Sequence, residues 1–531
     1  MSYNLIREPW IPARRRSGRV EWVPPWKVTE GAGHDPFVAL AAVRPDFNGA
    51  LIQFLIGLAQ TTFAPEDPRT WRQRLKAPPP PEALRQAFET VARAFDLDGD
   101  GPRFMQDLDE LEGQKAQEAT RLLIEEPGDH TMKENRDHFI KRGRSSRFCL
   151  PCAATAVFTL QVNAPSGGQG HRTSLRGGGP LTTLICQDTL WRTIWMNVLV
   201  EEDWHGLNQC RDASREYRHP WLGPTRTSER GESTTPADVP HEHMFWGMPR
   251  RIYLEFETDD EPRPCGLCGR LATRHARSYR TKPRGFNYEG GWLHPLTPHR
   301  WQDNQPIPIH GQPNGLSYKD WLGLALAASD GSRKPALTVQ RLYQERIEWI
   351  RDRGLGLWAF GYDMDNMKAR GWTEGRLPLV LVDPLHVLPF EMAARNMVLI
   401  AEKAVQDLLY AVRTALFGQR DDRRKKGLPH LDHNFWIETE NDFYRLLRRL
   451  ADGLENGWTN ESTGMIDLKL EWLALLGRAA ENLFEKHVWT ERIEQSDVKR
   501  VAAAWNGLRA ALHPNNKKNR NLLMLPDRRA A

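Results

Sequence analysis

Residues 391–417 read EMAARNMVLIAEKAVQDLLYAVRTALF, a run in which apolar residues recur every three or four positions. That spacing places side chains on one face of an α-helix. The expected apolar face consists of Met397, Ala401, Ala404, Leu408, Ala411 and Ala415. Gly418 follows the run, and glycine commonly ends a helix because it adopts left-handed backbone conformations easily. We therefore predict one long helix from about residue 391 to residue 417.

Three more amphipathic patterns follow this helix. The second helix has the apolar face Phe443, Leu446, Leu447, Leu450 and Leu454, and the third has Leu473, Leu476, Ala480 and Leu483. The fourth has Val498, Ala502, Trp505, Leu508 and Leu512. It begins after Ser496 and Asp497, whose side chains can cap its first turn, and it ends before Pro514. Because each helix has one apolar face to bury, we predict a C-terminal four-helix bundle over residues 385–531.

Upstream of the bundle the sequence has a different character. Gly, Pro and Asp interrupt it every few residues, and short β-like runs alternate with helical stretches. Examples of β-like runs are 20–23, 181–185 and 251–256, and examples of helical stretches are 48–60 and 82–95. A chain of 531 residues also exceeds what one hydrophobic core usually organises. We predict an α+β protein with a large, irregular mixed domain over residues 1–384, followed by the bundle.

The composition is typical of a folded globular protein, with 40% hydrophobic and 27% charged residues. A net charge of +5 favours anionic partners only slightly over this length. The N-terminal sequence MSYNLIREPWIP lacks the basic start and apolar core of a secretory signal. The most apolar run, residues 50–59, is interrupted by Gln53 and is too short to span a bilayer. We therefore predict a cytoplasmic protein without a membrane role.

Four of the six cysteines form two C-x-x-C pairs, Cys149-Leu-Pro-Cys152 and Cys265-Gly-Leu-Cys268. Each pair can present two thiolates on a tight turn, and together they complete the tetrahedral shell of a structural Zn²⁺ ion. Such a site is closed, so the zinc would join distant segments and catalyse nothing. Free cysteines, or a redox dithiol in one pair, are the alternatives, although redox motifs occur singly beside a βαβ unit. Cys186 and Cys210 lack partner spacing and are expected to be buried apolar residues.

A glycine-rich segment, residues 164–180, reads APSGGQGHRTSLRGGGP. Its glycines allow the backbone to approach another molecule and to expose N–H groups. The segment contains neither a G-x-x-x-x-G-K-[ST] motif nor a G-x-G-x-x-G motif that opens a helix, so neither ATP nor a dinucleotide is indicated. By composition alone, a flexible connector is the better interpretation.

Basic residues cluster in three places, and catalytic patterns are absent. The clusters are Lys141, Arg142, Arg144 and Arg147; Arg423, Arg424, Lys425 and Lys426; and Lys517, Lys518 and Arg520. Such clusters are usually solvated, but they can also bind nucleic-acid phosphates. His34-Asp35 is an isolated dipeptide, and His241-Glu-His243 is expected to be a surface pair without a third metal ligand. The sequence therefore supports no enzymatic activity.

Several motifs in a fixed order carry a resemblance to a known family. They are Leu5–Pro12, Phe104–Gln106, the two cysteine pairs, Leu175–Gly178, Trp292–Pro295 and Gly361–Ala369. Together with a mixed N-terminal region and a C-terminal helical region, they resemble the large subunit, CasA, of the type I-E CRISPR surveillance complex Cascade. The resemblance spans the chain.

The resemblance implies a non-enzymatic DNA-recognition subunit. Such a subunit reads the protospacer-adjacent motif in double-stranded target DNA from the minor groove and promotes duplex opening and R-loop formation with the guide RNA. The partners implied are the 5′ end of the guide RNA, the guide-binding backbone subunits, the small-subunit dimer and a separate helicase-nuclease that cleaves the target for antiviral defence. The alternatives are a stand-alone zinc-containing nucleic-acid enzyme and a structural scaffold without DNA contact.

The resemblance also implies site residues. The motif-reading glycine loop corresponds to Ser166, Gly167, Gly168, Gln169 and Gly170, with Gln169 where the family often has glycine. The lysine finger corresponds to Lys282 or Arg284, because Pro283 occupies its nominal position. The strand-separating wedge corresponds to Asp365, Asn366 and Met367, and the loop toward the motif and the guide to His138, Phe139 and Lys141.

On the predicted bundle, Arg445, Arg448 and Arg449 flank an apolar stripe and can point away from the core, toward the phosphates of the displaced DNA strand. The basic link from Arg423 to Lys426 is a second candidate for this contact. A solvated helical face is nearly as good an interpretation of these residues.

Overall fold

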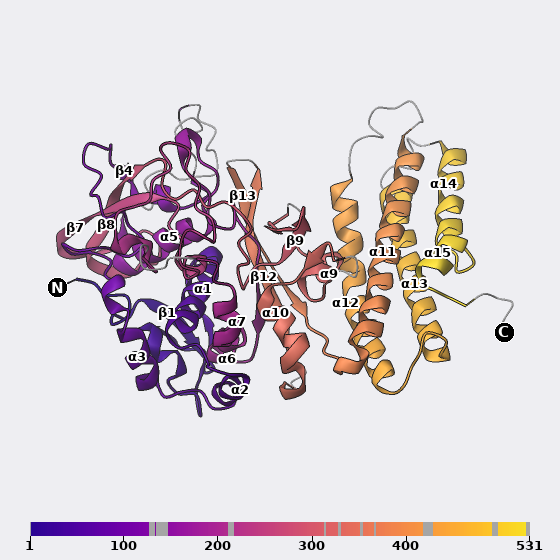
Figure 1. Ribbon diagram of the computed structural model, residues 1–531. Helices are drawn as coiled ribbons and strands as arrows, with labels where there is room; N and C mark the ends of the chain where they lie inside the picture. Colours follow the sequence, from indigo (N-terminus) through magenta and orange to yellow (C-terminus); the bar gives the residue numbers. More distant parts are fainter. Residues whose placement is uncertain are drawn as a thin grey trace. The chain divides into compact units, whose positions relative to one another are not determined.

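The computed structural model describes residues 2–126, 133, 147–210, 217–312, 315–327, 331–350, 354–365, 368–417, 428–490 and 497–526 (Figure 1). It is a mixed fold of helices and several sheets, and it divides into two compact units. The first unit contains Met1–Pro313, Ala336–Val339 and Gly356–Glu374, and the second contains Asn314–Pro335, Gln340–Leu355 and Gly375–Ala531. The mixed α+β content is confirmed. Separate domains over residues 1–384 and 385–531 stay a prediction.

A helix buried on almost all sides organises the first unit. In α1 (Pro45–Thr62) every residue from Gly49 to Gln60 is buried, as the apolar sequence of this stretch leads one to expect. Phe54 lies at the centre of an aromatic cluster, with ring centroids 5.0–5.9 Å from those of Trp10, Phe95, Phe104, Phe158 and Trp246. α1 also packs against α5 (Leu150–Asn163), which carries the first cysteine pair at its start.

The first unit contains antiparallel sheets around these helices. β1 (Ile11–Arg15), β2 (Val20–Val23) and β3 (Phe37–Leu40) pair in the order β2-β1-β3. β8 (Leu271–Lys282) pairs with β4 (Gln117–Glu118), β5 (Phe148–Cys149) and β7 (Arg251–Pro264). β6 (Thr182–Cys186), β12 (Gly356–Asp365) and β13 (Lys368–Pro378) lie in the order β13-β12-β6. β9 (His299–Gln302) pairs with β10 (Gln305–Pro308), and β11, in the second unit, spans Arg333–Lys334.

The shorter helices connect these strands. They are α2 (Pro68–Lys76), α3 (Pro81–Glu89), α6 (Leu190–Met196), α7 (Glu201–Gly206), α8 (His243–Trp246), α9 (Trp321–Leu324) and α10 (Leu337–Arg341). The run predicted at 20–23 matches β2, and that at 181–185 matches β6 within one residue. The helix predicted over 82–95 ends earlier, at Glu89, and a short 3₁₀ turn at Ala92–Ala94 follows it.

Long helices dominate the second unit. α11 (Val387–Leu416), α12 (Pro429–Glu455), α13 (Thr463–Phe484) and α14 (Val498–Ala511) run along one another in Figure 1, and α15 (Lys517–Leu522) follows. α11 packs against α12, α13 and α14. The apolar faces predicted for the first three helices are buried along their whole length.

The face predicted for the fourth helix was wrong in part, although Leu508 and Leu512 are buried as predicted and Trp505 is half-buried. Val498 is 68% exposed and Ala502 is also exposed, whereas Val501, Ala504 and Leu508 are buried. The Asp497 side chain caps the N–H groups of Lys499 and Arg500 as predicted and thereby fixes where the helix begins. Two apolar patterns in α14 share Leu508. The helix packs against α11, and the pattern that includes Val501 is the one that is buried. Among the residues described above, no helix is both long and apolar enough to cross a membrane.

Candidate metal centre and nucleic-acid interface

The four paired cysteines come together in the first unit, as their spacing predicted. Cys149 ends β5 and precedes α5, and Cys152 lies in the first turn of that helix. Cys265 and Cys268 lie in the tight turn that joins β7 to β8, where Gly269 adopts φ +72°. All four Sγ atoms lie within 4.8 Å of one another. Three of the thiols are buried, and that of Cys268 is partly exposed.

The geometry of this cluster fits a tetrahedral metal ion. The Cys149 and Cys268 Sγ atoms are 3.7 Å apart, and a zinc ion with Zn–S bonds of about 2.3 Å requires sulfur atoms separated by about 3.8 Å. The N–H groups of Cys149 and Leu267 donate to Cys265 Sγ at 3.3 and 3.5 Å, which stabilises a thiolate there. Hydrogen bonds from Cys149 and Cys152 lower the pKa of the Cys268 thiol to about 7. The donor set therefore suits a cation that binds deprotonated sulfur.

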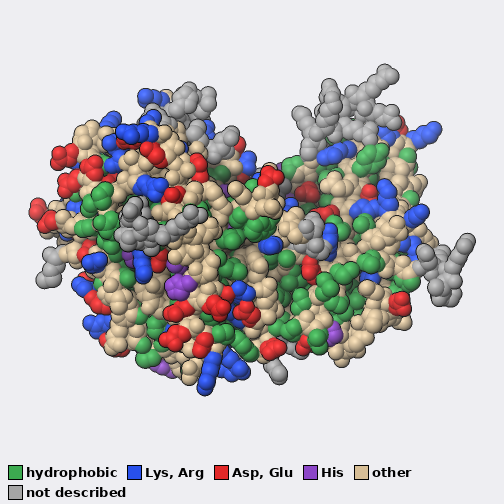
Figure 2. Space-filling model, viewed as in Figure 1, with side chains coloured by type: hydrophobic (Ala, Val, Ile, Leu, Met, Phe, Trp, Pro, Cys, Tyr) green, Lys and Arg blue, Asp and Glu red, His purple; other side chains and the backbone are tan. Residues whose placement is uncertain are grey.

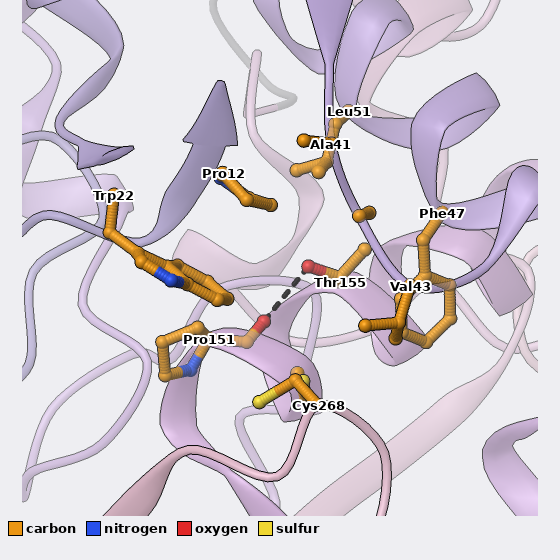
Figure 3. Close-up of a pocket in the computed structure, with 11 residues that line it drawn as sticks. Pro12, Trp22, Ala41, Val43, Phe47, Leu51, Pro151, Thr155 and Cys268 are labelled. Carbon is orange, nitrogen blue, oxygen red and sulfur yellow. Dashed lines mark hydrogen bonds between the residues drawn. The ribbon is translucent and has the colours of Figure 1, made fainter. Parts of the chain in front are cut away.

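An apolar pocket lies beside the cysteines (Figure 3). Trp22, Pro151 and Phe47 line it together with Cys268, and the Thr155 hydroxyl donates to Pro151 O (2.8 Å) within α5. Apolar surroundings limit the access of water to metal–sulfur bonds. The apolar lining beside Cys268 is therefore compatible with a metal site shielded from water.

Over the described ranges, the four cysteines are the one group of metal-ligating side chains that converge. The Asp35 carboxylate accepts hydrogen bonds from Ser17 and shapes a turn. The expectation of a surface pair at His241 and His243 was wrong, because both side chains are buried and His243 lies in α8. The expectation that Cys186 and Cys210 are buried was also wrong, since both are partly exposed.

The glycine-rich loop, residues 164–180, connects α5 to β6. At its base, Ser174 N–H donates to Ala164 O (3.0 Å) and Gly179 N–H donates to Asn163 O (3.2 Å). Ser166 and Gly168 are exposed, and Gly168 has open space where a Cβ would stand. The tip of the loop can therefore approach another molecule closely.

The middle of this loop, at Gly170, meets the predicted lysine-finger segment. The Arg284 N–H donates to Gly170 O (2.9 Å), and Gly170 adopts φ +87° with its Cβ position only 3.1 Å from Arg284 Cγ. Arg284 is exposed, and its Nη1 donates to Glu229 O (2.9 Å). Lys282 Nζ lies 3.9 Å from the Glu229 carboxylate. The two predicted recognition elements thus form one continuous surface.

The C-terminal end of the loop, at Gly179, meets the strand that leads to the predicted wedge. A Cβ on Gly179 would lie 2.6 Å from Tyr362 O and 2.9 Å from Met364 Cγ, so β12 packs directly on the loop. Asp365 ends β12 and is exposed. Asn366 and Met367 lie outside the described residues.

Other predicted contacts also fall outside the described residues. They are His138, Phe139 and Lys141 of the loop toward motif and guide, and the basic link Arg423–Lys426.

The predicted displaced-strand arginines lie on α12 with different partners. Arg445 donates to Glu471 (2.9 Å) and Asp442 (3.0 Å), and Arg449 donates to the same Glu471 (2.5 Å). Arg448 is exposed. Among these three arginines, the Arg448 guanidinium makes the fewest contacts with carboxylates over the described part of α12 and α13.

A sequence model of the family described as CRISPR-associated protein Cse1 matches residues 4–483. The chain belongs to the Cse1 family. This confirms the resemblance to the CasA large subunit, which rested on scattered short motifs.

Solved structures of Cse1 proteins have the same fold. CasA of Thermus thermophilus has 17% sequence identity and a TM-score of 0.70, and the match covers 96% of this chain and 99% of that protein. Cse1 of Thermobifida fusca has 16% identity and a TM-score of 0.70, with 98% of both chains covered. A chain of a CRISPR RNA-guided surveillance complex has 16% identity and a TM-score of 0.64, with 96% and 99% covered.

One buried contact in this Cse1 chain has only a weak signal in the sequence. Arg176, in the glycine-rich loop, is 4% exposed and donates to Thr182 Oγ1, Thr297 Oγ1 (both 2.9 Å) and Gln53 Oε1 (2.6 Å). Gln53 is the polar residue that interrupts the apolar run of α1, and it lies 123 positions from Arg176. A polar residue within an apolar helix was the one available hint. The contact fixes the loop to the core of the first unit.

Proposed function

We propose that this chain is the large subunit of a type I-E Cascade complex and recognises the protospacer-adjacent motif in double-stranded target DNA. It would promote duplex opening and R-loop formation with the guide RNA and support recruitment of the helicase-nuclease that carries out cleavage. One observation carries the proposal: the glycine-rich loop contacts Arg284 through Gly170 and the strand leading to the wedge through Gly179. Membership of the Cse1 family over residues 4–483 supports it.

The proposed reading uses the minor groove. The backbone of the stretch Ser166–Gly170, which is exposed at Ser166 and Gly168, can approach the base edges, and Lys282 or Arg284 can enter beside it. The degenerate pattern of the minor groove permits several related motifs. Inserting Asp365, Asn366 and Met367 between the first base pairs would cost a few kcal/mol of unstacking. Guide pairing then replaces the duplex that is lost. The subunit itself needs no catalytic residue for these steps.

The proposed cofactor is a structural Zn²⁺ held by Cys149, Cys152, Cys265 and Cys268. It would join the start of α5 to the tip of the β7–β8 hairpin, whose last residues include Lys282. The metal supplies no reaction chemistry, because four thiolates leave no open coordination position.

The second unit is proposed to act as a four-helix bundle in assembly. Its proposed contacts are the small-subunit dimer and the displaced strand, while the guide-binding backbone and the 5′ end of the guide RNA are proposed partners of the whole subunit. Structures of the RNA-guided surveillance complex that have this fold support these assignments. The proposed location is the cytoplasm.

Lys282→Ala and Asn366→Ala are expected to weaken binding of the reconstituted complex to intact duplex targets that carry the motif. They should spare targets whose motif-adjacent region is already melted, because these side chains serve duplex opening. The affinities of wild type and variants for a library of motif sequences, prepared as intact and as melted targets, measure both effects. Equal losses on melted and intact targets would show that the two side chains supply general affinity instead.

Replacing Arg448 with glutamine is expected to shorten the lifetime of the open R-loop. Because one phosphate contact is lost, the slope of the logarithm of R-loop stability against the logarithm of salt concentration should fall by about one. Arg445→Gln should have a smaller effect, because Glu471 and Asp442 already engage that guanidinium. R-loop lifetimes measured over a range of NaCl concentrations test this. If both variants leave the lifetime and slope unchanged, this face of α12 is a docking surface or a solvated face.

The main rival function is a stand-alone metal-dependent nuclease. Incubating the purified chain with DNA and divalent cations distinguishes the two. Cleavage that Cys265→Ser abolishes would contradict the proposed non-enzymatic role.

A further inference from the structure

Two arginines at the glycine-rich loop, Arg172 within it and Arg250 beside it, have no carboxylate partner in the part of the chain that the structure describes. Arg250 follows α8 and lies under the start of the loop, where its Nη2 donates to Pro165 O (2.5 Å). A Cβ on Gly167 would lie only 2.8 Å from Arg250 Nη1, so the guanidinium packs directly against the recognition stretch. Arg172, two residues beyond Gly170, donates to the hydroxyl and the carbonyl of Ser228 (2.9 and 3.4 Å). All of these acceptors are neutral.

Among the described residues, no carboxylate pairs with the Arg250 guanidinium, whose one side-chain hydrogen bond goes to a backbone carbonyl. Its Nε is buried without a hydrogen-bond partner among the described residues. Burial lowers its pKa to about 10, and the Tyr279 hydroxyl is the one group that acts in the opposite direction. The side chain therefore remains charged at neutral pH. On the face shown in Figure 2, by contrast, basic and acidic side chains are mostly interspersed.

Arg250 is partly buried and its Nε is fully covered, and a covered charge without a counter-charge is unfavourable for folding. Anchoring Pro165 O by itself requires only a neutral donor such as a glutamine amide, so the hydrogen bond does not account for the charge. The loop is also exposed at Ser166 and Gly168, directly beside this charge. The missing counter-charge can therefore come from a ligand bound at the loop.

We propose that Arg172 and Arg250 form a phosphate-binding site at the base of the glycine-rich loop, and that its ligand is the sugar–phosphate backbone of a DNA duplex. Arg172, which is partly exposed, contacts a phosphate directly, and Arg250 contributes positive potential from beneath the loop. This site holds the duplex whatever its sequence, whereas the loop tip and Lys282 or Arg284 read the motif. The inference deepens the proposed function and rests on it for the identity of the duplex.

The test measures binding of the full-length chain to a short duplex without the motif, over a range of NaCl concentrations. Arg172→Gln and Arg250→Gln are each expected to weaken binding about tenfold at low salt and to reduce the salt slope by about one. Arg250→Lys loses the forked hydrogen-bond geometry but keeps the charge, so it should retain the wild-type slope. Arg85→Gln, at an exposed arginine of α3 paired with Glu82, is the matched control and should leave the slope unchanged.

The possible outcomes separate a charge effect from a structural one. Wild-type slopes in natively folded Arg172→Gln and Arg250→Gln variants would overturn the inference. If Arg250→Gln fails to fold, Arg172→Gln and Arg250→Lys still decide it through their slopes. A parallel duplex that carries the motif tests the proposed function itself: equal wild-type affinity for both duplexes would contradict motif reading, while reduced slopes in the variants would still support the phosphate site.

Discussion

Replacing Cys265 with serine is expected to abolish stoichiometric zinc binding and to destabilise the first unit by more than about 4 kcal/mol, the range in which loss of a structural metal falls. Cys265 Sγ accepts hydrogen bonds from the N–H groups of both Cys149 and Leu267, so it is the most strongly stabilised thiolate of the cluster. Its pKa is lowered, first by Cys149 and then by Cys152 and Cys268. A serine hydroxyl supplies neither the negative charge nor the soft sulfur that zinc prefers.

Elemental analysis and thermal denaturation of the purified chain check this expectation. Wild type should carry about one zinc per chain. Cys210→Ser, which changes a partly exposed cysteine outside the cluster, should retain both the metal and the stability of wild type. Wild-type protein with well under one equivalent of metal would contradict the zinc assignment, and full stability in Cys265→Ser would show that the metal has no structural role.

Gly179→Ala is expected to separate the glycine-rich loop from β12 and to cost about 2–4 kcal/mol of stability. The residue adopts φ +60°, and its new methyl group would lie 2.6 Å from Tyr362 O and 2.8 Å from Tyr362 Cβ. β12 cannot easily yield, because the Tyr362 hydroxyl donates to Asp46 at 2.7 Å in the core. Under the proposed function, motif-dependent opening of intact duplexes should fall by more than tenfold, equivalent to about 1.4 kcal/mol.

Gly168→Ala is the matched control for stability. Its Cβ position has open space within 4 Å, so the variant should unfold at the wild-type temperature. It should nevertheless weaken duplex binding, because the added methyl group hinders the close approach of the loop tip to the groove. Denaturation curves and duplex-binding curves for both variants check these expectations. A stable Gly179→Ala variant with normal duplex opening would show that the contact between loop and β12 is dispensable.

The candidate metal site was largely predictable from the sequence, whereas the candidate nucleic-acid interface was only partly so. Two C-x-x-C pairs specify the type of ligand and the geometry of each turn. Two such pairs in one chain therefore indicate that the four thiols meet at one site. The glycine loop and Arg284 were singled out separately, by resemblance to a family. Their contact depends on how α5 and β8 pack, and no short-range pattern encodes that.

The long C-terminal helices, the buried faces of the first three of them, the mixed character of the N-terminal part and the convergence of the four paired cysteines were all predictable from the sequence. These features depend on periodicity and on short spacings, which act through local backbone geometry. Tertiary structure alone decided the buried face of α14, the contact between Gln53 and Arg176, and the position of Arg250 beneath Gly167. Each depends on which of several locally equivalent side chains finds a partner across the core, because burial energy is set by neighbours far apart in the sequence.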